Sequence, residues 1–145
     1  MTPTQPGDRW LYVSSGAAAR HTPDGHLEFF IISPVADVIH VETLAMVTSF
    51  TLDPRFEIRL GKILEIGRPW LPDSQCDHLL VSLPYPYPPA FAELGPATRI
   101  LWLLPITREE AAFGRAHGIE ALEQCFEREK LEYWDPQRTT VRLST

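Results

Sequence analysis

The stretch from Arg99 to Phe126 constrains the fold more than any other part of this sequence. It opens with the unbroken apolar run Ile100–Leu104, passes through Pro105, and continues into a helical pattern after Thr107. A strand that is apolar on both faces is normally covered on both faces, which predicts a place at the centre of a sheet. We therefore expect a central strand that leads directly into a helix.

The sequence also predicts where this helix begins and ends. Pro105 has no N–H to donate and should end the strand. Thr107 suits an N-cap, and Glu110 three residues later completes a capping box. Gly118 fits the left-handed position at which a helix ends. A second helix is expected from Ile119 to about Lys130, with these residues on its inner face: Ile119, Leu122, Cys125 and Phe126.

The remaining segments do not follow a regular β-α-β order. Arg9–Ser14 and Leu27–Ser33 should form an antiparallel pair joined across the Asp24-Gly25 turn. A helix is predicted over His40–Leu52, with this inner face: Val41, Leu44, Ala45, Thr48 and Leu52. Further strands are expected at Lys62–Ile66 and His78–Leu83, a loop at Gly67–Ser74, a stiff polyproline-like segment at Tyr85–Phe91, and an optional edge strand at Thr139–Leu143; Arg55–Leu60 fits strand or loop.

This order indicates an α+β fold, with a mixed or antiparallel central sheet, helices packed on it, and a C-terminal helix pair. A length of 145 residues suits a single domain over residues 1–145, of which we expect 1–8 to be disordered.

Composition limits the possible functions. The net charge of −6 and the pI near 5.3 argue against a nucleic-acid partner. They fit a basic protein partner, or simple solubility. No apolar run approaches the ~20 residues that span a bilayer, the N-terminus does not resemble a signal peptide, and the two cysteines indicate no disulfide framework. We expect a cytoplasmic protein that does not bind membranes.

The densest cluster of reactive side chains is Cys76-Asp77-His78. A zinc site needs three or four ligands, and no second Cys or His pair completes one. Cys125 lies on an apolar helix face, where a thiol is buried and inert, and the five histidines are scattered and expected at the surface. We expect no metal, no cofactor and no catalytic set, and keep an enzyme that uses Cys76 and His78 as an alternative.

Aromatic residues in proline-rich loops suggest a binding surface instead. Tyr and Trp offer large, rigid contacts, and proline lowers the cost of ordering a loop on association. The alternative is that Trp70 and Tyr85 fold back onto the core as lids. The predicted contact residues are Trp70, Tyr85, Tyr87 and Phe91, with Asp73, Asp77 and Glu93 nearby in sequence.

Several of these motifs together resemble the suppressor of fused (SUFU-like) domain family, in order and spacing, from about Gly16 to Val141. The matching segments are Ile100–Thr107, Gly118–Glu123, Gly67–Pro72, Leu79–Tyr85 and Asp135-Pro136 with Arg138. The resemblance implies a protein-binding module of α+β architecture.

Animal members of this family hold a peptide of Gli-type transcription factors as an added β-strand, with the help of a further C-terminal domain. This chain ends at Thr145, and Gly61-Lys62 lacks the acid that follows the glycine in those members, so we do not expect this peptide as its ligand. Short bacterial relatives imply an immunity protein that neutralises a polymorphic toxin by direct binding. A third alternative is a scaffold protein that self-associates through an edge strand near Val141, and the oligomeric state stays open.

Overall fold

The computed structural model describes residues 9–14, 21–22, 25–53, 55–87, 93–95 and 98–145. The chain forms two compact units. The first unit comprises Met1–Lys62 and Val81–Leu104, and the second comprises Ile63–Leu80 and Pro105–Thr145. Residues 1–8, predicted to be disordered, lie outside the described residues.

The first unit is built mainly of strands. Its elements are β1 (Trp10–Val13), β2 (His21–Thr22), β3 (Gly25–Ser33), α1 (Ile39–Phe50), β6 (Glu93–Gly95), and the parts of β5 (His78–Ser82) and β7 (Thr98–Ile106) that fall within it. The strand order is β1-β3-β7-β5, with β2 paired to β3 and β6 paired to β7. β1 runs antiparallel to β3, and β3 runs parallel to β7. The sheet is therefore mixed, and β7 is a central strand, as its apolar run predicted.

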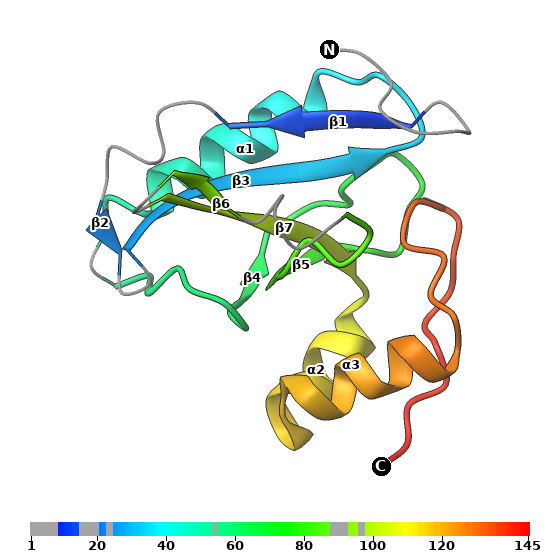
Figure 1. Cartoon of the computed structure of the whole chain (residues 1–145). Helices are drawn as coiled ribbons and strands as arrows, with labels where there is room; N and C mark the ends of the chain where they lie inside the picture. Colours follow the sequence, from blue (N-terminus) through cyan, green and yellow to red (C-terminus); the bar gives the residue numbers. More distant parts are fainter. Residues whose placement is uncertain (1–8, 15–20, 23–24, 54, 88–92, 96–97) are drawn as a thin grey trace. The chain divides into compact units, whose positions relative to one another are not determined.

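The core of the first unit forms where β3 and β7 lie side by side. Phe29, Phe30 and Leu101 are each fully buried. The ring of Phe30 stacks on that of Trp102, with 6.4 Å between centroids. The helix α1 lies against β1 and β3 (Figure 1).

The second unit carries the helix pair. Its elements are β4 (Ile63–Glu65), α2 (Arg108–His117), α3 (Ile119–Arg128), and the adjoining parts of β5 and β7. β4 pairs antiparallel with β5. The predicted capping box is present, since the Thr107 hydroxyl accepts from the Glu110 N–H and the Glu110 carboxylate accepts from the Thr107 N–H. Gly118 separates the helices at a φ of 95°.

A second glycine allows the two helices to approach closely. A Cβ atom on Gly114 would lie 3.1 Å from Cδ2 of Leu122 on α3 and 3.2 Å from Cδ1 of Ile63 on β4. Such distances are shorter than ordinary van der Waals contact, so a larger side chain at this point would push the helices apart. The contact between α2 and α3 thus depends on a residue without a side chain (Figure 1).

The predicted inner face of α1 is wrong. The buried residues are His40, Thr43, Leu44 and Val47, whereas Val41 is 51% exposed and Leu52 is 54% exposed. Only Leu44 belongs to both sets. The helix carries apolar side chains on two sides, and the polar residues decide which side is buried. His40 Nε2 lies 2.9 Å from the Ser33 hydroxyl, and the Thr43 hydroxyl donates to the Ile39 carbonyl oxygen, so each of these polar side chains has a hydrogen-bond partner inside.

Three smaller predictions also need correction. Thr139–Leu143 forms no strand; instead the Val141 N–H donates to the Glu110 carboxylate. The described start of the segment Tyr85–Phe91 is a turn closed by the Tyr87 N–H on the Pro84 carbonyl oxygen, because these backbone groups pair locally rather than with a strand. His40 and His78 are buried rather than exposed, because each finds a polar partner close in sequence.

Candidate partner-binding surface

The turn after β5 displays one of the predicted aromatic contacts. Tyr85 is 61% exposed, the highest value for any described aromatic residue. Its backbone is fixed, because its N–H donates to the Leu83 carbonyl oxygen at 2.8 Å and the Tyr87 N–H donates to Pro84 at 3.0 Å. Proline at position 84 is buried and restricts the turn further. Tyr85 is thus a large amphipathic side chain presented on a stiff support.

Tyr87 anchors the same turn. It is half-buried, and its ring meets that of Phe30 edge-on, with 5.9 Å between centroids. An edge-to-face arrangement is a favourable geometry for two aromatic rings. One tyrosine therefore holds the turn on the core of the first unit, while the other faces outward.

Trp70 lies in the second unit as a core residue, so its side chain offers almost no surface to a partner. It is 2% exposed, and its indole Nε1–H donates to the Ser74 hydroxyl at 3.1 Å. The same hydroxyl accepts from the Cys76 N–H, and the Trp70 N–H donates to the Cys76 carbonyl oxygen. The loop from Trp70 to Cys76 closes on itself around the indole, which is the lid arrangement that the sequence analysis kept as an alternative.

The other predicted contact residues are scattered. Asp73 is exposed at the tip of the Trp70 loop, with a left-handed φ of 66°. Asp77 is half-buried and its Oδ1 lies 2.7 Å from Nδ1 of His78. Glu93 belongs to β6, but its side chain and all of Phe91 lie outside the described residues. Of the predicted set, the described side chains that belong to the first unit are those of Tyr85 and Tyr87.

The Cys76-Asp77-His78 cluster is enclosed. Cys76 is fully buried and His78 is 4% exposed. Burial raises the pKa of the Cys76 thiol above its ordinary value; the charge of Arg138 opposes this shift, and the charge of Glu110 adds to it. A raised pKa disfavours the thiolate, which is the nucleophilic form. Within the described ranges no three His, Cys, Asp or Glu side chains are grouped so that they could hold a metal ion.

A buried ion pair that was not predicted from the sequence organises the second unit. Arg138 binds Glu110 through two hydrogen bonds, from Nη2 to Oε1 at 2.7 Å and from Nη1 to Oε2 at 2.8 Å. Arg138 also donates to the carbonyl oxygens of Pro105 and Thr139. Burial alone would lower the pKa of Arg138, but its hydrogen bonds with Glu110 and the charge of Glu110 raise it above its ordinary value. The pair joins the start of α2 to the C-terminal segment.

This ion pair was hidden because its partners are 28 residues apart. Glu110 was correctly predicted to be a capping residue, and its carboxylate takes part in both the cap and the ion pair. Arg138 appeared only as part of the closing segment of the family resemblance. The one available signal was an arginine after a turn-forming Asp135-Pro136 pair, in a segment too short to form its own core.

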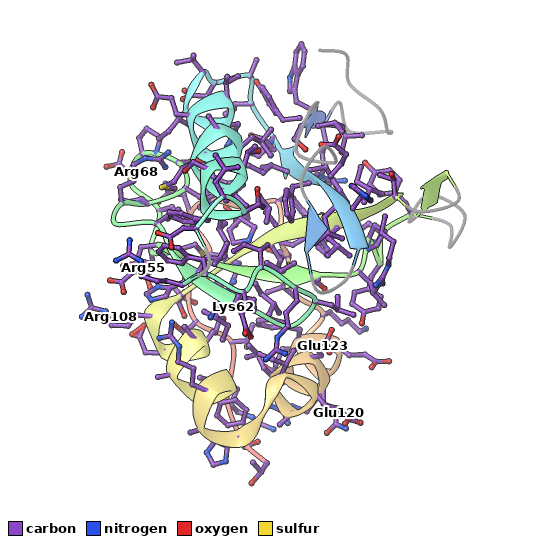
Figure 2. All side chains as sticks on the ribbon, turned by 90° about the vertical axis from the view of Figure 1, so that its left-hand side faces the viewer. Arg55, Lys62, Arg68, Arg108, Glu120 and Glu123 are labelled. Atoms are coloured by element: carbon purple, nitrogen blue, oxygen red, sulfur yellow. The ribbon has the colours of Figure 1, made fainter. Side chains whose placement is uncertain are left out.

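Exposed side chains of both kinds lie on the helices. In the first unit, Val38, the N-cap of α1, is 70% exposed and Val41 is 51% exposed, beside the exposed Glu42 and Ser49. In the second unit, Glu120 is exposed on α3, and Glu123 is half-buried one turn further along (Figure 2). None of the helices in the described part combines the length and apolarity that crossing a bilayer requires.

Comparisons with known proteins agree with this architecture. The family model for suppressor of fused protein (SUFU) matches residues 2–139. Among solved structures, the chain is similar to a candidate SUFU homolog from Neisseria gonorrhoeae FA 1090, known from a crystal structure at 1.40 Å resolution. The two are 38% identical, with a TM-score of 0.87, over 98% of this chain and 76% of the other. No curated protein matches the sequence. Because the family model spans almost the whole sequence, and a solved homolog shares both sequence and fold, the chain belongs to the suppressor of fused (SUFU) family.

Proposed function

We propose that this chain is a non-enzymatic protein-binding module that neutralises a toxin protein by direct binding. The observation that carries the proposal is the exposed side chain of Tyr85 on a fixed turn. Tyrosine is enriched among the residues that dominate binding energy at protein interfaces. A turn that is already ordered loses little conformational entropy when a partner covers it.

Membership of the SUFU family supports the binding part of this proposal. The family resemblance implies binding rather than catalysis for its members, and the short bacterial relatives imply immunity against toxins. The solved homolog from a bacterium has the same fold over nearly the full chain. The partner itself is our inference from this relationship.

The charge balance supports a basic partner. With a net charge of −6, the chain would attract a basic toxin surface and accelerate encounter. Neutralisation would then be steric, because a bound chain covers the surface that the toxin uses. We place this in the cytoplasm, where the two buried cysteines, which are free thiols, are kept reduced.

The burial of Cys76 and His78 argues against the alternative function, an enzyme that uses these two side chains. A nucleophile needs access to its substrate and a thiolate form, and Cys76 is fully buried with a raised pKa. Replacing Cys76 by Ser would abolish activity in an enzyme of this kind, whereas toxin neutralisation should survive the change.

The test is a growth assay in which a bacterium expresses a candidate toxin, chosen from the genes that neighbour the one encoding this chain. Co-expression of the wild-type chain should restore growth, and Tyr85→Ala should restore it less at equal protein level. Tyr85→Phe keeps the ring and serves as the matched control. If the wild-type chain fails to protect at any expression level, the toxin is not the partner. If Tyr85→Ala protects as well as wild type, the surface assignment is wrong.

A further inference from the structure

The segment after Arg138 is held in place by side chains rather than by secondary structure. Residues 139–145, all of which the structure describes, belong to neither a helix nor a strand. The contacts of this segment fall into two groups, one at the start of α2 and one at the end of α3. We call residues 142–144, which contact the end of α3, the strap.

The contacts at the start of α2 are enclosed. The Val141 N–H donates to the Glu110 carboxylate at 3.0 Å, beside the buried ion pair of Glu110 with Arg138. The Thr140 hydroxyl lies 2.8 Å from that of Thr107, which is fully buried. Opening this group of contacts would strand a buried carboxylate, which carries a large cost in free energy. The segment is therefore fixed firmly up to Val141.

The contacts at the end of α3 are much more accessible. Arg128, in the last turn of α3, donates from Nη2 to the Arg142 carbonyl oxygen at 2.6 Å and from Nη1 to that of Ser144 at 3.5 Å. The Arg128 side chain is 37% exposed, and Arg142 and Ser144 are exposed as well. Leu143 between them is half-buried and is the one apolar side chain of the strap. Exposed hydrogen bonds with little buried apolar surface are typical of segments that open locally.

The strap also closes over a cysteine. Cys125 lies on the inner side of α3 and is 0% exposed. Its Sγ donates to the Ser144 carbonyl oxygen at 3.5 Å, so the backbone of the strap lies directly against the sulfur. A thiol is a weak donor, and this bond adds little to the attachment of the strap. Among the described contacts, those of Arg128 and Leu143 therefore supply most of it.

We propose that the strap is a detachable cover for Cys125, and that the Arg128 guanidinium controls how often it opens. In the open state the hydrogen bonds from Arg128 are lost, whereas the ion pair between Glu110 and Arg138 stays in place. A reagent can reach the Cys125 thiol in this state, although the rest of the unit is still folded. This opening involves neither Tyr85 nor a toxin.

Alkylation of the full folded chain by iodoacetamide tests the strap directly, because the rate at a covered thiol follows the population of the open state when closing is fast. Mass spectrometry after digestion assigns each adduct to Cys125 or Cys76. Arg128→Gln removes the guanidinium, and we expect Cys125 to react about five to ten times faster. Arg128→Lys should restore only part of the protection, because an ammonium group lacks the planar fork that bonds two oxygens at once.

Leu143→Ala tests the strap from its own side. This variant changes no charge near the thiol, and the loss of apolar contact should speed the alkylation of Cys125 about fivefold. Arg115→Gln is the matched control, since Arg115 is exposed in the last turn of α2. The control should be alkylated at the wild-type rate.

Cys76 serves as the internal standard in every variant. It is fully buried in the Trp70 loop, where its N–H donates to the Ser74 hydroxyl, so its alkylation rate should stay unchanged. If Arg128→Gln and Leu143→Ala leave the rate at Cys125 at the wild-type value, the strap does not control access to the thiol. If Cys76 accelerates by the same factor as Cys125, the variants loosen the whole unit, and a detachable strap is ruled out.

Discussion

Replacing Arg138 by Met should destabilise the protein more than any other single loss of charge in its second unit. The Arg138 side chain is 6% exposed and that of Glu110 is 0% exposed. Met keeps an unbranched apolar side chain in place of the arginine stem but removes the guanidinium and its four hydrogen bonds, to both Glu110 oxygens, Pro105 and Thr139. Among the residues that the structure describes, the Glu110 carboxylate would then be a buried charge held by two backbone N–H groups, those of Thr107 and Val141.

The expected magnitude follows from this loss. Breaking a buried ion pair by removing one partner costs about 3–5 kcal/mol, against a total stability of about 5–15 kcal/mol for a domain. With a urea m-value of about 2 kcal/mol/M, the unfolding midpoint should fall by roughly 1.5–2.5 M. Part of this cost comes from the stranded carboxylate rather than from the lost attraction. The double variant Glu110→Gln/Arg138→Met should therefore lose less than the sum of its two single variants, by about 1–3 kcal/mol.

Urea titration followed by circular dichroism measures these differences. Arg115→Met is the matched control, since Arg115 is exposed in the last turn of α2 and its loss should cost less than about 0.5 kcal/mol. If Arg138→Met costs under about 1 kcal/mol, the pair behaves like a surface ion pair. If the stability losses of the two single variants simply add up in the double variant, Glu110 and Arg138 are not coupled as an ion pair.

Two further predictions concern the same unit. Lys130 has a left-handed φ of 51° at the end of α3, where the Leu131 N–H donates to the Phe126 carbonyl oxygen. Because glycine adopts this conformation without strain, Lys130→Gly should raise the unfolding free energy by about 0.5–1 kcal/mol in urea titration. As a control, Gln124→Gly within α3 should lower the unfolding free energy by about 1 kcal/mol. Burial raises the pKa of Cys76, so the folded chain keeps this proton when the unfolded chain loses it. The stabilisation from keeping this thiol protonated is complete below the ordinary thiol pKa of about 8.5 and is lost as pH rises through the folded pKa. The unfolding free energy should therefore decline above about pH 8.5, and Cys76→Ser should show a shallower decline. An equal slope in both proteins would contradict this assignment.

Much of the fold was predictable because its signals are local. The capping box of Thr107 and Glu110 spans three residues, and Gly118 marks a helix end by its own conformational freedom. The apolar run of β7 indicated a buried central strand; residues 100–106 are all buried, and β7 is paired on both edges. These features depend on neighbours along the chain, and sequence order shows those neighbours directly.

Features that depend on distant residues were harder to predict. The inner face of α1 was misassigned because Val41 and Leu52 fit an apolar stripe as well as Leu44 and Val47 do, and the decision rests on the hydrogen bond between His40 and Ser33. The Glu110–Arg138 pair joins segments that no periodicity connects. Trp70 was assigned to a binding surface because proline neighbours suggest an exposed loop, yet Ser74 satisfies its indole N–H inside the unit.

For the candidate binding surface, the sequence predicted the types of residue but not which of them are exposed. The sequence indicated that tyrosines and prolines gather after β5, but not which ring would face outward. The hydrogen bonds of the turn decide this by fixing Tyr85 away from the core while Tyr87 packs on Phe30.

The most direct test of the proposed function is isothermal titration calorimetry of the purified chain with the candidate toxin from the growth assay, alongside an assay of that toxin's activity. We predict a one-to-one complex that abolishes toxin activity, and a loss of affinity of about 30-fold for Tyr85→Ala, which corresponds to the roughly 2 kcal/mol of a binding hot spot. A toxin that stays active when saturated with the chain, or that is consumed or modified by it, would contradict neutralisation by binding.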